Sequence, residues 1–432
     1  MTYLSWLSIF RLGLVQLCLG AIVVLTTSTL NRLMVVELAL PAVLPGLLVG
    51  LHYAIQITRP NWGFRSDSGG NRTRFIILGM MALGSGGFLA ALGFVVMASA
   101  YGVGLLISIL AYGLIGLGVG ASGTSLLALL ATATNPRRRA AAATITWLMM
   151  IFGIAVTATV VGKLLDPYSP DRLLKLVAAV ATLAVLVTSL AIWGIERRHG
   201  GAVQPETAPQ PFAKGMAEIW AEPRARNFTL FIFLSMVAYF MQELILEPYA
   251  GLTFGLTPGQ STALSGAQNG GVFVGMLIVG IAATGLRIGS LRAWVVLGCL
   301  GSAAALLALA IAGQLAAGAG LLLPVSVALG LFNGVFAVAA IGSMMALASE
   351  GRAEREGTRM GLWGASQAIA AGMGGLFGAG AVDVMRQLTD TASAFGWVFT
   401  FEAGLFAAAA IMAAQIIDTR HQPMLGQAVP GE

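Results

Sequence analysis

The feature that most constrains this chain is a succession of apolar runs, each roughly 20 residues long, which suffices to cross a bilayer as an α-helix. Only 10% of the 432 residues are charged, whereas an ordinary soluble domain carries about 25%. Backbone polar groups in lipid need protein partners, so the spans must be helices or a closed barrel, and runs of this length favour helices. The sequence therefore predicts an all-α membrane protein.

We predict twelve transmembrane helices in two halves of six, separated by the longest segment between spans. The predicted spans are 12–32, 40–58, 75–98, 102–131, 141–163, 173–195, 227–248, 261–284, 293–315, 320–348, 360–382 and 396–418. We expect an N-terminal half, a cytoplasmic linker, a C-terminal half and a cytoplasmic tail, at residues 1–195, 196–226, 227–418 and 419–432. Apolar residues at helical spacing in the linker predict an amphipathic helix on the membrane surface, although a soluble connecting helix has the same pattern. These residues are Phe212, Met216, Ile219 and Trp220.

The orientation follows from Lys and Arg, which stay on the cytoplasmic side of short loops. With an inside N-terminus, all but five of the 24 basic residues are cytoplasmic. The five are Arg32, Lys163, Arg172, Lys175 and Arg386. We therefore predict that both chain ends are cytoplasmic. Because the basic residues lie in short loops, the net charge of +6 does not indicate binding of nucleic acid. Both cysteines lie in apolar runs and support neither a disulfide nor a metal site.

The loop after the second predicted span has the order glycine, acid, glycine, base, at Gly63, Asp67, Gly70 and Arg72. The glycines allow a tight turn, and the charged groups can interact with helix ends and with each other at a cytoplasmic gate. An ordinary basic turn is the alternative. The loop resembles the signature of the major facilitator superfamily, although Ser68 and Asn71 replace its usual basic residues. A weaker copy at residues 285–292 resembles the second loop expected of two related six-helix halves.

Ionisable residues are almost absent from the interiors of predicted spans three to six and eight to ten. The arginine in span four and the Gly-Pro signature in span five that proton-driven members of that superfamily commonly carry are also absent. Charges inside a bilayer are costly and usually mark a route for ions or polar substrates. The sequence therefore argues against proton-coupled transport of sugars, ions or drugs, and fits an apolar ligand or no transport.

A few polar side chains in the C-terminal spans are exceptions, at Gln242, Glu243, Glu247, Gln367 and Glu402. Glu243 and Glu247 are four residues apart and share a helix face, while Glu402 and Asp383 fall toward the outer ends of their spans. They are candidate contacts for a cation, a protein partner or a polar head group. Alternatively, the carboxylates are solvated at the periplasmic boundary near Arg386, and amides such as Gln367 form interhelical hydrogen bonds.

His52 is the only histidine within a predicted span, and Gln56 lies one turn further on the same face. An imidazole nitrogen suits the magnesium of a tetrapyrrole, so the two residues are candidate pigment ligands. A histidine that joins two helices by a hydrogen bond is the alternative. We expect no metal ligated by protein side chains and no catalytic residue.

Several stretches resemble the PucC/LhaA proteins of photosynthetic bacteria, a branch of the same superfamily. The most specific is Met-Gln-Glu-Leu-Ile-Leu-Glu-Pro-Tyr-Ala-Gly at 241–251, and the others are residues 25–32, 36–38, 51–53, 267–271 and 360–367. They fall in both halves, so the likeness covers nearly the whole chain. The resemblance implies an assembly factor that delivers bacteriochlorophyll to antenna α and β polypeptides or guides their oligomerisation.

The same resemblance implies bacteriochlorophyll as bound cargo and light-harvesting α and β polypeptides as partners, in the inner, intracytoplasmic photosynthetic membrane of a bacterium. Bacteriochlorophyll synthase, the membrane insertion machinery, membrane lipid and a second copy of the chain are further candidate partners.

Two other functions remain to be weighed. One is a facilitator or flippase that moves a lipophilic small molecule across the membrane. The other is an enzyme that attaches the isoprenoid tail of the pigment, which would need aspartate pairs to hold magnesium and diphosphate. The only close aspartates, Asp166 and Asp171, flank prolines in a predicted periplasmic loop. We therefore expect that the chain is not an enzyme.

Overall fold

The computed structural model describes residues 3–58, 72–135, 139–196, 220–285, 288–315, 318–349 and 356–417. Helices make up nearly all of these ranges, and no strand occurs in them. The predicted amphipathic helix of the linker lies in 197–219 except for Trp220, and the predicted tail, 419–432, lies beyond 417, so apart from Trp220 both fall outside the described residues.

The N-terminal part of the bundle consists of α1 (Trp6–Val24), a π-helical turn η1 (Leu25–Thr29), α2 (Leu30–Val36), α3 (Val43–Ile55), α5 (Arg72–Met97), α6 (Tyr101–Ala133), α7 (Arg139–Leu165) and α8 (Pro170–Ile192). The first three elements form one apolar helix of 31 residues. At the start of α8, Ser169 accepts a hydrogen bond from the backbone of Arg172, and Pro170 takes a first-turn position that needs no N–H partner.

The C-terminal part consists of α11 (Pro223–Phe254), α12 (Pro258–Val279), a π-helical turn η4 (Gly280–Gly285), α13 (Leu291–Ala312), α14 (Ala319–Ser349), α15 (Glu356–Leu388) and α16 (Thr391–Ile416). The turn from α11 to α12 follows from local sequence. Gly255 ends α11 with a left-handed φ of 69°, which favours glycine. Thr257 and Gln260 then form a capping box at the start of α12.

Eleven described helices are long and apolar enough to cross a membrane, and α3 is a shorter apolar helix. With α3 counted, the prediction of twelve membrane helices is confirmed. The second predicted span is shortened, because the chain turns after Val36 and α3 begins only at Val43. Its 13 residues rise only about 20 Å, less than the hydrocarbon thickness of a bilayer.

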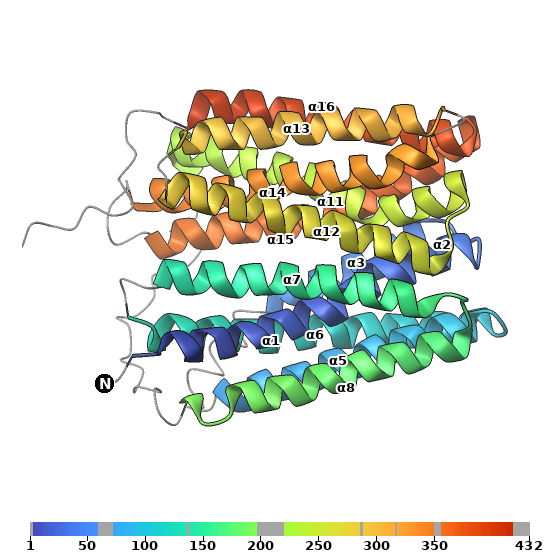
Figure 1. The fold of residues 1–432 in the computed structure, drawn as a ribbon, viewed down its shortest axis with the longest axis horizontal. Coiled ribbons are helices and arrows are strands. Elements are labelled where there is room, and N and C mark those ends of the chain that lie inside the picture. Colours follow the sequence, from blue (N-terminus) through green and yellow to red (C-terminus); the bar gives the residue numbers. More distant parts are fainter. Residues whose placement is uncertain are drawn as a thin grey trace, which may run out of the picture.

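The bundle has two large apolar cores, one built almost wholly from α1–α8 and the other from α11–α16. The two parts lie one above the other in Figure 1, with α7 against α12 and α3 against α15. Glycines allow the first pair to approach closely. A Cβ added at Gly162 would lie 2.6 Å from the backbone nitrogen of Ala263. Small residues at such crossings are typical of helix packing in membranes.

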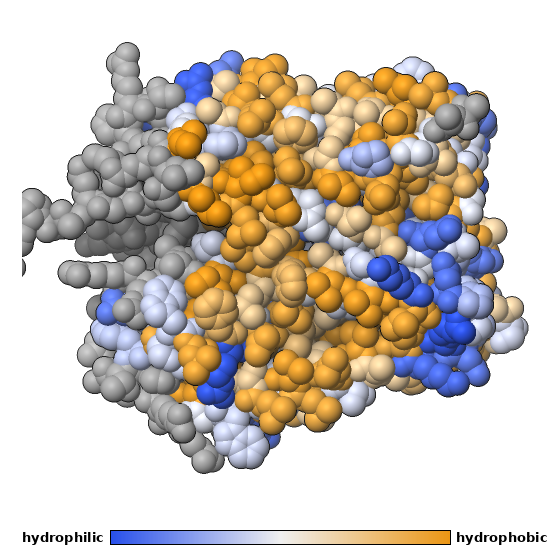
Figure 2. Space-filling view, viewed as in Figure 1, coloured by the Kyte–Doolittle hydropathy of each residue, from blue (hydrophilic) through white to orange (hydrophobic). Residues whose placement is uncertain are grey.

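Large apolar side chains face outward on many helices, among them Leu190 and Leu388, with 66% and 73% of their surface exposed. Figure 2 shows apolar side chains across the middle of the visible face. Such a surface needs lipid as its solvent. The chain is a multi-pass membrane protein. The start of α1 and the end of α16 lie at the same end of the bundle, and we call the opposite one the far end (Figure 1).

Candidate functional site

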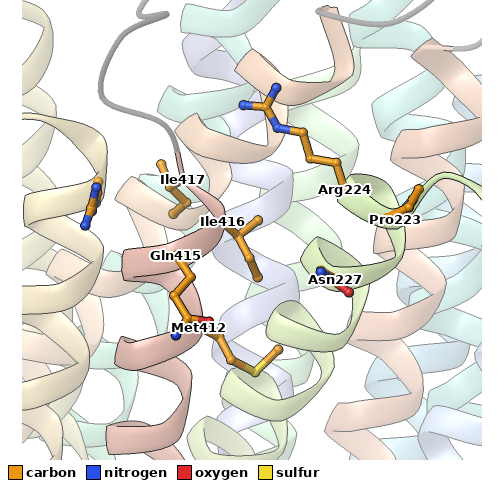
Figure 3. A pocket seen from close by; sticks show the side chains of 8 residues that line it. Pro223, Arg224, Asn227, Met412, Gln415, Ile416 and Ile417 are labelled. Carbon is orange, nitrogen blue, oxygen red and sulfur yellow. The ribbon is translucent and has the colours of Figure 1, made fainter.

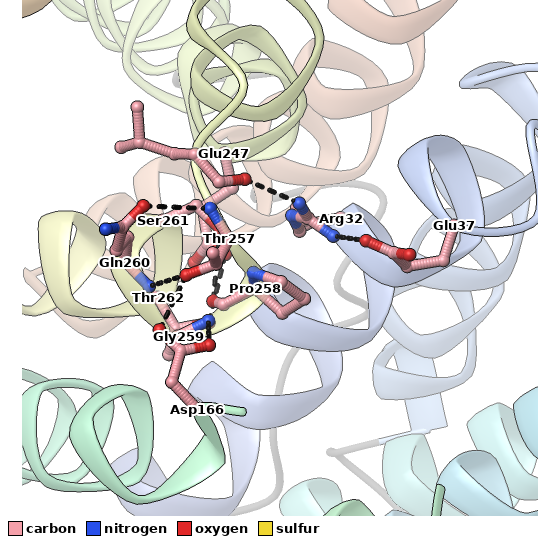
Figure 4. A network of polar contacts seen from close by, with 11 residues as sticks. Arg32, Glu37, Asp166, Glu247, Thr257, Pro258, Gly259, Gln260, Ser261 and Thr262 are labelled. Carbon is pink, nitrogen blue, oxygen red and sulfur yellow. Dashed lines mark hydrogen bonds and ion pairs between the residues drawn. The ribbon is translucent and has the colours of Figure 1, made fainter. Parts of the chain in front are cut away.

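Arg32 lies at the centre of a buried polar cluster at the far end of the bundle, where it joins the two halves. Only 2% of its surface is exposed. Its guanidinium forms an ion pair with Glu37, and its Nη2 donates a hydrogen bond to the carbonyl oxygen of Leu256 at 2.8 Å. Leu256 belongs to the turn between α11 and α12, so the second contact crosses between the halves. Figure 4 shows Arg32 and Glu37 beside the start of α12 at Thr257 and Pro258.

The sequence predicts Arg32 at the outer end of the first span, 12–32, and does not predict its burial. The helix does not end at residue 32 but continues to Val36, and it carries the arginine into the interface. The π-helical turn η1, which precedes α2, is contacted by Tyr112 of α6. The hydroxyl of Tyr112 donates a hydrogen bond to the carbonyl oxygen of Thr26 at 2.6 Å. π-helical turns are rare and occur often at functional sites.

Glu247 of α11 faces the same interface and is only 1% exposed. Its Oε2 lies 3.2 Å from Oγ1 of Thr262, which in turn lies 3.3 Å from Oγ1 of Thr29. Arg32 is near enough to interact with the carboxylate electrostatically. Within the described part of the chain, Oε1 of Glu247 has no hydrogen-bond partner. The hydroxyls of Ser28 and Ser265, 3.2 Å apart, extend this polar contact between the halves.

Two further carboxylates tie the halves together at the same end. Asp166, after α7, accepts hydrogen bonds from Oγ1 of Thr257 at 2.6 Å and from the backbone nitrogen of Gly259 at 3.1 Å. Asp383 of α15 accepts from the backbone nitrogens of Ala42 and Val43 at 2.9 and 2.7 Å. Each acid therefore caps a helix of the other half, α12 or α3, where unsatisfied N–H groups favour negative charge.

A second polar group lies inside the C-terminal half. Nε2 of Gln268 donates to Oε1 of Gln242 at 2.8 Å, and both side chains are buried. Glu402 of α16 lies beside the backbone of Gln242 and is fully buried. Neither carboxylate oxygen of Glu402 has a hydrogen-bond partner among the residues described. Buried polar atoms without partners are rare and call for an explanation.

The interpretation that these acids are solvated at the periplasmic boundary is wrong for Glu247 and Glu402, because both are enclosed by neighbouring helices. Glu402 is also the twelfth residue of the 26-residue helix α16, so it lies near mid-helix and not at its outer end. Of the other candidate residues, Gln242 belongs to the same polar group as Glu402. Glu243 of α11 and Gln367 of α15 are half-buried.

His52 and Gln56 are both buried on α3 and the turn that follows it, as their spacing predicts. Their Nε2 atoms lie 2.6 Å apart. The imidazole also packs edge-on against Tyr53, with ring centroids 4.7 Å apart. Because Nε2 of His52 already contacts Gln56, this nitrogen could bind a pigment magnesium only after that contact is broken. The pigment-ligand role stays a prediction.

Three residues of the predicted gate motif, Gly63, Asp67 and Gly70, lie outside the described residues. Arg72, the fourth, is buried, and its Nη1 lies 3.4 Å from the carbonyl oxygen of Ala128 on α6. The backbone nitrogens of Arg72 and Thr73 both donate at 2.7 Å to the carboxylate of Glu196, which caps α5. Sequence reasoning missed Glu196, although its place beside a basic loop is a usable signal.

In the described ranges, no group of three or more His, Cys, Asp or Glu side chains could hold a metal ion. The buried carboxylates thus belong to two polar groups in a mostly apolar bundle. One joins the halves at the far end, and the other, at Gln242, Gln268 and Glu402, lies within the C-terminal half.

A protein-family model described as PUCC protein matches residues 29–421 of this chain. The chain belongs to the PUCC protein family. A relative in Rhodobacter capsulatus, named bacteriochlorophyll synthase 44.5 kDa chain, is 66% identical over 99% of this chain and 100% of its own length. Protein PucC of Cereibacter sphaeroides is 30% identical over 92% of this chain and 89% of its own length.

This PUCC family member has the fold of solved membrane transporters, which agrees with the predicted bundle of two six-helix halves. A bacterial homologue of human drug peptide transporters superimposes with a TM-score of 0.70 at 15% identity, covering 95% of this chain and 97% of its own. The nucleoside transporter NupG also has a TM-score of 0.70, at 12% identity, over 95% and 100% of the two chains. At these identities the likeness concerns the fold.

One expectation from the sequence is contradicted. We expected that the chain is not an enzyme, but the relative at 66% identity is named as a chain of bacteriochlorophyll synthase. Aspartate pairs that hold magnesium and diphosphate serve only one chemistry, prenyl transfer, so the lack of a suitable pair in the sequence does not bear on a part in an enzyme complex.

Proposed function

We propose that this PUCC family member handles bacteriochlorophyll in the photosynthetic membrane of a bacterium and serves the assembly of light-harvesting complexes. It delivers the pigment to antenna α and β polypeptides or guides their oligomerisation. The observation that carries the proposal is the family match over residues 29–421, together with the relative whose name ties that protein to bacteriochlorophyll.

The described spans support an apolar cargo. The apolar stretches of α5, α6, α8 and α14 hold no acid. Of the buried charged residues, Arg32 and Glu247 lie where the halves meet, Glu402 lies inside the C-terminal half, and Arg72 lies at the start of α5. A porphyrin with an isoprenoid tail, or a single-span antenna helix, needs an apolar contact surface and few polar anchors. In this proposal His52 and Gln56 hold the pigment, and Gln242, Glu243, Glu247, Gln367 and Glu402 contact polar groups of the pigment or of a partner.

The proposal includes a location and partners. The protein lies in the inner, intracytoplasmic membrane with both ends in the cytoplasm, because most Lys and Arg then lie inside. Its partners are the antenna polypeptides, with bacteriochlorophyll synthase and the membrane insertion machinery as neighbours in the same assembly process.

Deleting the gene in photosynthetic cells tests the proposal. Assembled antenna, measured by near-infrared absorbance of membranes, should fall, while extracted bacteriochlorophyll per cell should fall less. If all bacteriochlorophyll is lost while its precursors persist, the assembly role is refuted and a role in synthesis is favoured. Unchanged antenna absorbance would refute both.

The pigment site is tested by purification in mild detergent, followed by an absorption spectrum of the bound pigment. His52→Ala should lower the bound pigment several-fold, and His421→Ala, a histidine of the predicted tail, is the matched control. Equal pigment on both variants would remove His52 as a ligand without affecting the assembly proposal.

A facilitator or flippase for a lipophilic small molecule is the second candidate. It is favoured by one observation, that the polar contacts between the halves gather at one end of the bundle, where they can serve as a gate that opens only when they break. Proteoliposomes that contain the purified protein should then move labelled pigment between leaflets, and no movement would count against this candidate.

A further inference from the structure

A pocket of about 700 Å³ lies between α11, α13 and α16, at the end of the C-terminal half opposite the buried Arg32 cluster. None of the residues discussed so far lines it. Figure 3 shows Arg224 and Asn227 of α11 on one side and Met412, Gln415 and Ile416 of α16 on the other. Arg292 of α13 belongs to the same lining.

The polar part of this pocket carries positive charge. Arg224 and Arg292 both line it, and no acid is among the lining residues that the structure describes. Each arginine lies in the first turn of its helix, at the second position of α11 and of α13. The unsatisfied N–H groups of two helix starts add partial positive charge to that of the guanidinium groups. Asn227 and Gln415 supply amide groups that can donate further hydrogen bonds.

The remaining wall is apolar and continues into the lipid-facing surface. Met412 and Ile416 are half-buried in the last turns of α16. Next to them, Ile411 of α16 exposes 61% of its surface, and Leu297, one turn and a half beyond Arg292 on α13, exposes 48%. A ligand with its charge at the arginines could therefore extend an apolar chain along α16 into the bilayer.

We propose that this pocket binds a phosphate-bearing anion, with the phosphate oxygens on Arg224 and Arg292. Guanidinium groups bind phosphate through paired, charge-assisted hydrogen bonds, which an ammonium group does not reproduce. The apolar wall favours a phosphate carried on a lipid, with the chain against Met412 and Ile416. The predicted orientation places the pocket at the cytoplasmic leaflet, where anionic head groups lie.

This inference goes beyond the proposed function and does not depend on it. Its alternative is that the two arginines only extend toward the membrane surface to hydrate their charges. The two alternatives predict different effects of replacing the arginines on the affinity for phosphatidylglycerol. General attraction of anionic lipid needs only charge, whereas a site needs these two side chains.

Native mass spectrometry of the full-length protein in mild detergent, titrated with phosphatidylglycerol, tests the site. We expect the double variant Arg224→Gln/Arg292→Gln to bind the first lipid about tenfold more weakly, with each single variant in between. Arg226→Gln is the matched control, because Arg226 is exposed on the same turn of α11 but does not line the pocket. It should stay within about twofold of the unmodified protein.

A second arm separates the sources of phosphate. Inorganic pyrophosphate is titrated against the protein with and without saturating phosphatidylglycerol. Binding of the lipid alone assigns the site to a head group, and binding of pyrophosphate alone assigns it to a soluble phosphate. Thermal unfolding confirms that the variants are folded, and Arg224→Lys/Arg292→Lys keeps the charge if the Gln variants unfold. If the double variant and Arg226→Gln change lipid binding equally, the proposal is overturned. It is also overturned if neither phosphatidylglycerol nor pyrophosphate binds.

Discussion

Replacing Arg32 by glutamine should loosen the far end of the bundle, and the loss can be worked out from its contacts. Glu37 is 36% exposed, so solvent screening limits its ion pair with Arg32 to about 1 kcal/mol or less. The hydrogen bond to the carbonyl oxygen of Leu256 has a charged donor and is worth about 1.5–3 kcal/mol. The neighbouring carboxylate of Glu247 also loses its cation. We expect Arg32→Gln to lower the free energy of unfolding by about 2–4 kcal/mol.

The assay is equilibrium unfolding in mixed detergent micelles, with hydrogen exchange to locate the change. Exchange should rise first at Thr257–Ser261, the capped start of α12. Arg11→Gln is the control. Its Nη2 donates to the carbonyl oxygen of Trp193 at 2.7 Å, a contact within the N-terminal half, so only about 1 kcal/mol or less should be lost.

A double-mutant cycle with Glu247→Gln isolates the electrostatic part. The two side chains interact, so the summed losses of unfolding free energy in the two single variants should exceed the loss in the double variant by about 0.5–3 kcal/mol. If Arg32→Gln unfolds no more easily than Arg11→Gln, or if the two substitutions are strictly additive, then this cluster does not hold the halves together.

Three further expectations follow from the same contacts. Asp383→Ala leaves two N–H groups of α3 without their acceptor and should cost about 1–2 kcal/mol of unfolding free energy, whereas Asp171→Ala, an exposed acid in the first turn of α8, should cost less; equal losses would disprove the cap. Gly162→Leu places a side chain against the backbone of α12 and should cost about 1–3 kcal/mol or more, while Gly404→Leu, where a Cβ meets nothing within 4 Å, should be tolerated. Hydrogen bonds from Ser393 lower the pKa of Asp390 at the start of α16, so its cap is fully present above the unfolded pKa of about 4 and is lost as pH falls through the lower folded value. Amide exchange at the start of α16 should therefore quicken only below about pH 4, and an earlier change, or the same profile in Asp390→Asn, would contradict this.

Much of the architecture was predictable because helix formation in a membrane depends on local sequence. A run of about 20 apolar residues forms a helix wherever it lies in the chain, so the spans, their number and the two-part organisation followed without knowledge of packing. The pair of His52 and Gln56 followed for the same reason, since residues four apart on a helix are neighbours.

The contacts that join the halves could not be predicted in this way. Arg32 contacts Leu256, which is 224 residues away, and Asp383 caps a helix 341 residues earlier. The same holds for Glu402 beside Gln242, and for the pocket between Arg224 and Arg292. Hydropathy placed Arg32 and Glu247 at a water boundary, since a lone charge is costly in lipid.

The sequence alone determined that lipid is the solvent of this chain and that twelve apolar helices cross or enter it. The tertiary structure decided which buried charges meet. A charge in a membrane protein is stabilised by partners from other helices. Those partners are set by how two six-helix halves pack, which no local pattern of residues encodes.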